Sequence, residues 1–289
     1  MAEVNYKELK KGGFMPQVQK DCFSLRLRVA GGNIQANQLL KVTEIADNFG
    51  QGYVHMTSRQ GIEIPFIKFA DVEIVKRELD EVGLQTGACG PRVRTITACQ
   101  GVNVCPSGLI DTTSLAKELD NRYFAKELPH KFKIGVTGCK NNCLKAEEND
   151  LGIKGGVRPI WHKDECNFCR LCEAVCPIQA IKVQKNNQVV TLDKEKCNYC
   201  GKCVKACPVQ SWDGESGFII SVGGLFGNRI AIGKQVFSFI SSKEQLFKVI
   251  DKTLEFFQKY GKKSERFRNT LDRVGWEIFE KELEVRNIE

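Results

Sequence analysis

A cysteine run that occurs twice along the chain limits what this protein can fold into more than any other feature. The run has the form C-x2-C-x2-C-x3-C-P, and its second copy begins about 31 residues after the first. The cysteines of the two copies are Cys166, Cys169, Cys172, Cys176, Cys197, Cys200, Cys203 and Cys207. The chain has 14 cysteines in 289 residues, and such tight spacings fit metal coordination better than a disulfide framework. Metal ligation needs reduced thiolates, so we expect a reducing compartment and, by default, the cytoplasm.

The repeated run is the pattern of bacterial ferredoxins that hold two [4Fe-4S] clusters. Three thiolates on one tight loop can each bind a different iron of a cubane, so the fourth ligand comes from elsewhere. In this pattern the last cysteine of each run crosses to the other cluster, so that Cys207 completes the first cluster and Cys176 the second. Zinc ribbons and disulfides are the alternatives, but zinc sites usually pair two cysteines with two distant ones.

Around these runs, hydrophobic periodicity predicts an α+β chain that is interrupted by an insert. A β-α-β-β-α order is predicted over residues 23–29, 37–49, 53–56, 62–69 and 71–82. Further helices are predicted at 111–127, 243–260 and 264–286, with a strand at 132–136. Composition shifts at about Trp161, and the cysteine-rich stretch closes near Trp212. We therefore expect an N-terminal part, a second part made of two segments, and an insert: 1–84, 85–160 with 213–289, and 161–212.

Two of the predicted helices carry specific expectations. Asp71 is a plausible N-cap for the helix at 71–82. The helix at 37–49 places six apolar residues on one face, which predicts that they pack into the core: Leu39, Leu40, Val42, Ile45, Ala46 and Phe49.

Four more cysteines lie outside the insert and form two looser pairs. These are Cys99-x5-Cys105 and Cys139-x3-Cys143. On spacing alone, a buried structural pair explains either of them as well as a metal site does. Their surroundings are more informative, because Cys99 follows Arg94-Thr-Ile-Thr-Ala and Cys139 follows Lys131-Phe-Lys133-Ile-Gly-Val-Thr-Gly. The last two cysteines, Cys22 and Cys89, are expected to be buried free thiols.

At these residues the chain resembles the siroheme sulfite and nitrite reductase family. The resemblance extends to residues 27–32, 57–61 and 223–229, and it is strongest to small anaerobic, dissimilatory-like sulfite reductases that carry an internal ferredoxin. It implies sulfite reductase-type α+β domains with an inserted two-cluster ferredoxin domain. It also implies a third [4Fe-4S] cluster on Cys99, Cys105, Cys139 and Cys143, with Cys143 as the bridge to a siroheme iron.

The resemblance further implies a set of cations that bind sulfite and supply protons on the open face of the siroheme. The matching residues are Arg28, Arg94, Lys131 and Lys133. An arginine fork can hold oxyanion oxygens, and a lysine ammonium can also release a proton. Arg59 and Arg229 are expected to pair with siroheme carboxylates. Gly224 and Asn228 lie in a glycine-rich segment that fits a close approach to a flat cofactor, although a plain turn also explains the glycines.

The implied activity is the six-electron reduction of sulfite to sulfide, with electrons supplied through the inserted clusters. Siroheme nitrite reduction is one alternative, and an electron-transfer subunit without siroheme is another. The electron donor is expected to be a flavoprotein subunit or a ferredoxin. Larger members of the family contain two copies of this unit, so one copy predicts a homodimer or higher homo-oligomer.

The formal charge of +8 has several explanations. No helix-turn-helix or aromatic-basic motif accompanies it, so nucleic acid is not expected as a partner. An anionic substrate and a polycarboxylate cofactor account for the charge. No apolar stretch approaches the roughly 18 residues of a membrane span, so no membrane segment is expected.

Overall fold

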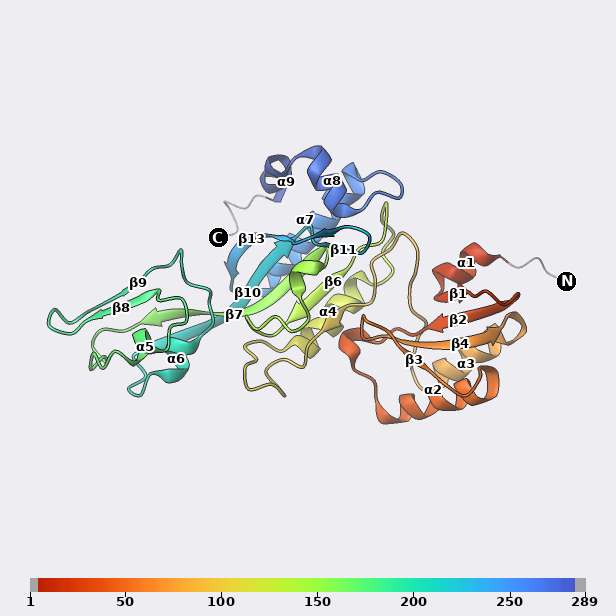
Figure 1. The fold of residues 1–289 in the computed structure, drawn as a ribbon, viewed down its shortest axis with the longest axis horizontal. Helices are drawn as coiled ribbons and strands as arrows, with labels where there is room; N and C mark the ends of the chain where they lie inside the picture. Colours follow the sequence, from red (N-terminus) through yellow and green to blue (C-terminus); the bar gives the residue numbers. More distant parts are fainter. Residues whose placement is uncertain (1–4, 284–289) are drawn as a thin grey trace.

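The computed structural model describes residues 5–283. An N-terminal α+β part, a central sheet with helices, and a cysteine-rich arm follow one another along the long axis of the molecule (Figure 1). The mixed architecture confirms the predicted α+β class. No helix between residues 5 and 283 is both long and apolar enough to cross a membrane.

The N-terminal part is an antiparallel sheet packed against two helices. Its strand order is β1-β2-β4-β3, with bounds Phe14–Pro16, Cys22–Arg26, Ile62–Lys68 and His55–Met56. Helices α2 (Ala36–Phe49) and α3 (Val72–Glu81) cover one face, and the short α1 (Tyr6–Lys11) precedes β1. Alternating burial along β2 and β4 puts residues such as Leu25 and Ile64 into a core of their own.

Two details differ from the sequence expectations in this part. Val42, Ile45 and Ala46 are buried on α2 and Phe49 packs partly buried against the same core, but Leu39 and Leu40 are 45% and 67% exposed. Asp71 occupies the N-cap position of α3 with helical backbone angles, and its side chain makes no capping hydrogen bond.

The central part is a five-stranded mixed sheet that carries the two strands leading to the looser cysteine pairs. Its order is β13-β10-β7-β6-β5, with bounds Lys234–Ile240, Trp212–Val222, Leu151–Trp161, Ile134–Thr137 and Thr97–Ala98. β5, β6 and β7 run parallel to one another, whereas β10 runs antiparallel to β7 and β13. Helices α4 (Thr112–Tyr123) and α7 (Lys243–Tyr260) belong to its hydrophobic core, together with the C-terminal helices.

The expected single helix over 264–286 is wrong within the described residues. The chain forms α8 (Phe267–Val274) and α9 (Trp276–Leu283), which are separated by Gly275 at φ +111°. A φ in this range is left-handed backbone that favours glycine, so the helix cannot continue through it. The break lets Phe267 and Phe279 meet with ring centroids 5.9 Å apart.

The cysteine-rich segment leaves and rejoins the central sheet on neighbouring strands. Trp161 ends β7, Trp212 begins β10, and the two residues are paired in the antiparallel register. Between them lie the hairpin of β8 (Ile181–Gln184) and β9 (Val189–Leu192) and two short helices. These helices are α5 (Leu171–Ala174) and α6 (Lys202–Ala206). The segment forms an arm at one end of the molecule with its own small hydrophobic cluster (Figure 1).

Candidate functional site

Cationic side chains converge on a cavity of about 240 Å³ between the N-terminal part and the central sheet. Five of them line it: Arg26, Arg59, Arg94, Lys131 and Lys133. They come from the end of β2, the β3–β4 turn, and the approaches to β5 and β6. Glu63 is the acidic residue among the lining side chains. The cavity therefore presents several positive charges to any small molecule that enters it.

The arginines of the cavity are fixed by oxygen acceptors around it. Arg94 donates Nη1 to Ala88 O at 2.5 Å and Nη2 to Gly90 O at 3.1 Å. Arg59 donates Nη1 to Asn149 Oδ1 at 2.9 Å and Nη2 to Thr95 O at 3.2 Å. These neutral acceptors fix the guanidinium groups in place without cancelling their charge, so the charge stays available to an anion.

Burial and crowding make four of the five cations easier to deprotonate, the exception being Arg26, whose pKa, against the effect of burial, is raised by Cys89 and Glu63. Burial, followed by the charges of Arg59 and Arg266, lowers the pKa of Lys133 to about 8. Burial also lowers the pKa of Lys131, with further contributions from Arg266 and Arg94. For Arg59, burial lowers the pKa to about 10. Lys133 is therefore a cation at neutral pH that can give up its proton at modest cost.

Four cations were expected on the open face of the siroheme. The structure brings Arg94, Lys131 and Lys133 into this cavity, whereas Arg28 points elsewhere. Arg28 Nε donates to Asp120 Oδ2 at 2.6 Å, and its guanidinium stacks 4.1 Å from the centroid of the Phe124 ring. β2 ends at Arg26, so strand alternation does not carry over to residue 28. Arg26 lines the cavity instead and is ion-paired with Glu63.

Sequence reasoning gave Cys89 no role beyond that of a buried thiol, and the structure places it beside the cationic cavity. The side chain is 1% exposed, and its Sγ lies 3.6 Å from Arg26 Nη1. The other unassigned cysteine, Cys22, begins β2 and is only half-buried. No signal in the sequence separates these two thiols, because Arg26 comes from a segment more than 60 residues away.

The looser cysteine pairs lie at the other ends of the strands that bring Arg94 and Lys133 to the cavity. Cys99 follows β5 and Cys139 follows β6. These two strands are paired in parallel, with Thr97 opposite Gly135. Gly138 N donates to Cys99 Sγ at 3.0 Å, so the two strand ends are in direct contact. The loop that contains Cys105 comes back to the same strand ends, because Leu109 N donates to Gly138 O at 2.8 Å. Cys143 is exposed in the turn that follows Cys139.

In the arm, the eight cysteines line two small cavities in crossed sets. One is lined by the first three cysteines of the first run and the last of the second: Cys166, Cys169, Cys172 and Cys207. The other is lined by the reciprocal set: Cys176, Cys197, Cys200 and Cys203. This is the ligand sharing that the two-cluster pattern predicts.

The two cysteine loops of the arm share one backbone conformation. Positive φ recurs at the same positions of each run, 31 residues apart: Phe168 and Tyr199, Arg170 and Gly201, and Gln179 and Gln210. Ala180 N donates to Cys176 Sγ at 3.2 Å, and Ser211 N donates to Cys207 Sγ at 3.3 Å. Amide N–H groups directed at sulfur favour the thiolate, which is the form that binds iron.

Among the described residues, no group of three or more His, Cys, Asp or Glu side chains is arranged to hold a single metal ion. The crossed cavities of the arm suit a cubane instead, because there each thiolate binds a different iron. Burial raises the pKa of the Cys203 thiol to about 12, so binding of iron there must displace a proton.

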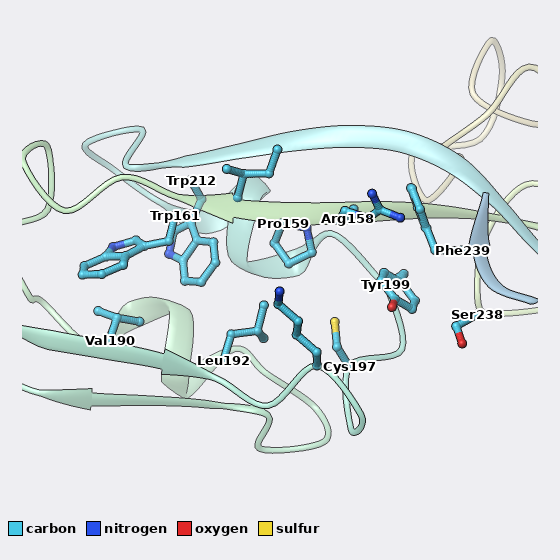
Figure 2. A pocket seen from close by; sticks show the side chains of 12 residues that line it. Arg158, Pro159, Trp161, Val190, Leu192, Cys197, Tyr199, Trp212, Ser238 and Phe239 are labelled. Carbon is cyan, nitrogen blue, oxygen red and sulfur yellow. The ribbon is translucent and has the colours of Figure 1, made fainter. Parts of the chain in front are cut away.

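A larger cavity of about 820 Å³ lies where the arm meets the central sheet (Figure 2). Trp161 and Trp212 line one end of it, and Tyr199 and Phe239 the other, with the latter two rings 5.0 Å apart. Cys197 lies on its wall. None of the five cations of the 240 Å³ cavity lines it, so the two cavities are separate features.

The glycine-rich segment after β10 is explained by protein contacts. A Cβ on Gly224 would collide with the backbone oxygens of Glu147 and Asn149, so glycine is required by this close packing. Gly227 has open space around it, and Asn228 and Arg229 are exposed. Of the residues expected beside a cofactor, Arg59 lies at the cationic cavity, whereas Asn228 and Arg229 do not line it.

Comparison with known proteins decides the family. The model of the nitrite and sulphite reductase 4Fe-4S domain matches residues 89–288, and that of the nitrite/sulfite reductase ferredoxin-like half domain matches residues 15–82. The chain belongs to the nitrite and sulphite reductase family. This confirms the family suggested by the sequence motifs.

Members of this family that are similar to the chain include two that are named as sulfite reductases. The coenzyme F420-dependent sulfite reductase of Methanocaldococcus jannaschii is 36% identical over 90% of this chain and 42% of its own length. One component of the anaerobic sulfite reductase of Salmonella typhimurium is 30% identical over 54% of this chain and 50% of its own length. The chain thus spans about half or less of each of these two relatives.

A solved structure shows the same fold. The crystal structure of dissimilatory sulfite reductase I aligns with a TM-score of 0.72 at 22% identity, covering 93% of this chain and 69% of the other. The predicted sulfite reductase-type fold is therefore confirmed. At this level of identity the likeness shows the fold alone.

Proposed function

We propose that this member of the family reduces sulfite to sulfide with a siroheme, using six electrons. The observation that carries the proposal is the convergence of five cations on one small cavity in a chain of this family. The arginines hold the oxyanion oxygens through their N–H forks. Lys133, whose pKa is about 8, donates protons as the three oxygens leave as water.

Cys99, Cys105, Cys139 and Cys143 would hold the [4Fe-4S] cluster that is coupled to the siroheme. Their soft thiolate donors suit iron-sulfur ligation, and Cys99 already accepts a hydrogen bond from Gly138 N. The exposed position of Cys143 suits a bridge to a group outside the cluster. When bound, the cofactor pair supplies the electrons, while the chain binds the anion and delivers protons.

The proposed site is shared between two copies of the chain. Lys133 precedes β6 and Cys139 follows it, so about six residues of extended strand, or roughly 15–20 Å, separate them. A macrocycle bound at the cysteines of one copy would therefore lie at the ends of β5 and β6 that point away from the cations of the same copy. A homodimer in which the cations of one copy face the siroheme of its partner satisfies the geometry.

Mixing two inactive variants tests the shared site. One chain carries Cys143→Ser and the other carries Lys131→Met with Lys133→Met, and each homodimer is expected to be inactive. Mixed dimers contain one intact shared site, so random assortment should restore about a quarter of the parent activity. If the mixture stays inactive although mixed dimers form, the site is not shared.

In the same proposal, the arm holds two [4Fe-4S] clusters that carry electrons inward, which brings the total to three. The Cys197–Cys203 loop lies nearer the core, because Val157 N donates to Tyr199 O at 2.8 Å. Lys205 Nζ also donates to Pro106 O at 3.2 Å, next to Cys105. Electrons from a flavoprotein subunit or a ferredoxin would reach the outer cluster first. The free cysteines suit a reducing compartment such as the cytoplasm.

Two measurements test the function. Absorption spectra of anaerobically purified protein should show strong siroheme bands in addition to cubane absorption, and the iron and sulfide content should match three cubanes and one siroheme. Bands of cubanes alone would indicate an electron-transfer subunit. A reduced-viologen assay should give a higher kcat/KM for sulfite than for nitrite, and the reverse order would establish nitrite reduction instead.

A further inference from the structure

The cationic cavity is backed by a buried ion pair that the mechanism above does not use. Asp150 is fully buried just before β7, and Arg266, at the N-cap of α8, reaches it with Nη2 at 3.0 Å from Oδ1 and 3.2 Å from Oδ2. The Arg266 side chain is 13% exposed, and within residues 5–283 its buried Nε has no hydrogen-bond partner.

The pair is joined to Lys133 through the backbone. Lys133 N donates to Asp150 Oδ2 at 2.9 Å, and Leu151 N donates to Lys133 O at 3.1 Å. The carboxylate thus extends the parallel ladder between β6 and β7 by one residue beyond the pairing of Ile134 with Leu151. This contact fixes the backbone from which the Lys133 side chain enters the cavity.

We propose that Arg266 is a positioning residue for proton delivery in this site, acting through Asp150 on the placement and charge environment of Lys133. The proposal rests on the proposed function only in assuming that the Lys133 proton is delivered to sulfite. The link between Arg266 and Lys133 is independent of it, because it consists of hydrogen bonds within the chain.

The charges that surround Lys133 set the direction of the effect. Arg59 from the β3–β4 turn, Arg266 from α8 and Lys131 from the same segment all disfavour its ammonium form, and Asp150 favours it. With Asp150 ionised, removing the Arg266 charge should raise that pKa. Removing the Asp150 charge should lower it, because Arg266 is left uncompensated.

The experiment measures the titration of Lys133 directly, in the holoprotein. Amine-reactive acetylation is followed by mass spectrometry over a range of pH in the parent, Arg266→Gln, Asp150→Asn and the double variant. The expected midpoint of Lys133 moves up in Arg266→Gln and down in Asp150→Asn, and lies near the parent value in the double variant. Arg266→Lys, which keeps the charge, should remain close to the parent. The exposed Lys243, paired with Glu118, serves as the internal reference and should not move.

A structural role alone would lower the stability of these variants without moving the Lys133 midpoint in opposite directions. Equal midpoints, or shifts of the same sign in the two single variants, would overturn the proposal. If one single variant fails to fold, the other still tests the proposal: a midpoint that moves in the expected direction supports it, and a midpoint at the parent value overturns it. The labelling does not require turnover, so failure of the proposed sulfite reduction remains a separate result.

Discussion

At the scale of single residues, the cationic cavity gathers like charges that repel one another. Its charge is balanced only in part, because Arg26 is paired with Glu63 while Arg94 and Arg59 rest on neutral oxygens. Two unit charges a few ångströms apart near a protein surface interact by several kcal/mol. An anion that enters the cavity relieves this repulsion, which is why the arrangement suits a small oxyanion better than a neutral ligand.

Arg26 and Arg28 should respond differently to the same substitution. Arg26→Met removes a cation from the cavity and should raise KM for sulfite about 10–100-fold, as expected for a lost charge-assisted hydrogen bond. Arg28→Met leaves the buried Asp120 without its ion-pair partner and should lower the free energy of unfolding by about 2–3 kcal/mol, with KM little changed. Steady-state kinetics and urea unfolding separate the two effects. A rise in KM in Arg28→Met as large as that in Arg26→Met would show that Arg28 also binds the substrate.

Lys133 should determine the alkaline side of the pH dependence. In the proposed function its ammonium form would be the proton donor, so kcat should fall as pH rises through its pKa of about 8. Lys133→Arg keeps a cation but cannot release a proton readily, so KM should change little while kcat falls about 10²–10⁴-fold. The measurement is a pH series of initial rates, with Lys243→Arg as the control. An unchanged kcat in Lys133→Arg would exclude it as the donor.

At the scale of elements, two short parallel strands separate the functions of the site. β5 and β6 have the cations before their first residues and the cysteines after their last, so in the proposed function each strand would connect a substrate-binding end to a redox end. The turn after β10 supports this layout, because it packs against residues 147–149, where Asn149 holds Arg59. Packing at that turn therefore affects the cavity indirectly.

Two glycines of one turn provide a matched pair for testing this packing. Gly224→Ala places a methyl group against the backbone of Glu147 and Asn149, and should lower the free energy of unfolding by about 1–3 kcal/mol through overpacking. Gly227→Ala meets open space and should be nearly neutral. Urea unfolding of both variants checks the difference. Equal stability would mean that the turn relaxes freely.

At the scale of the whole molecule, the arm is attached in a way that leaves the central sheet complete. The register between β7 and β10 is continuous up to the pair of Trp161 and Trp212, so the arm begins and ends on paired strand ends. In the proposed function, a segment attached at adjacent strand ends would add two clusters at low cost to the rest of the fold.

Replacing residues 162–211 by a two-residue Asn-Gly turn should leave a folded chain. The expected product keeps the absorption bands of siroheme but lacks the iron of two cubanes. Turnover with a protein donor should fall to near zero, whereas small reduced viologens should still support it, because they can reach the inner centres directly. Loss of the siroheme bands on removing the arm would show that the arm is needed for the core site.

The sequence by itself determined the local chemistry of this protein. Cysteine spacing predicted the crossed sets in the arm, and periodicity predicted most helices and strands, because these depend on short-range geometry. The tertiary structure decided which distant side chains meet. It placed Arg26 rather than Arg28 at the cavity, and it broke the last helix at Gly275. It also joined Arg266 to Lys133 through Asp150, although the two cations are more than 130 residues apart in the sequence. Such pairings depend on how strands and helices pack, which no local pattern encodes.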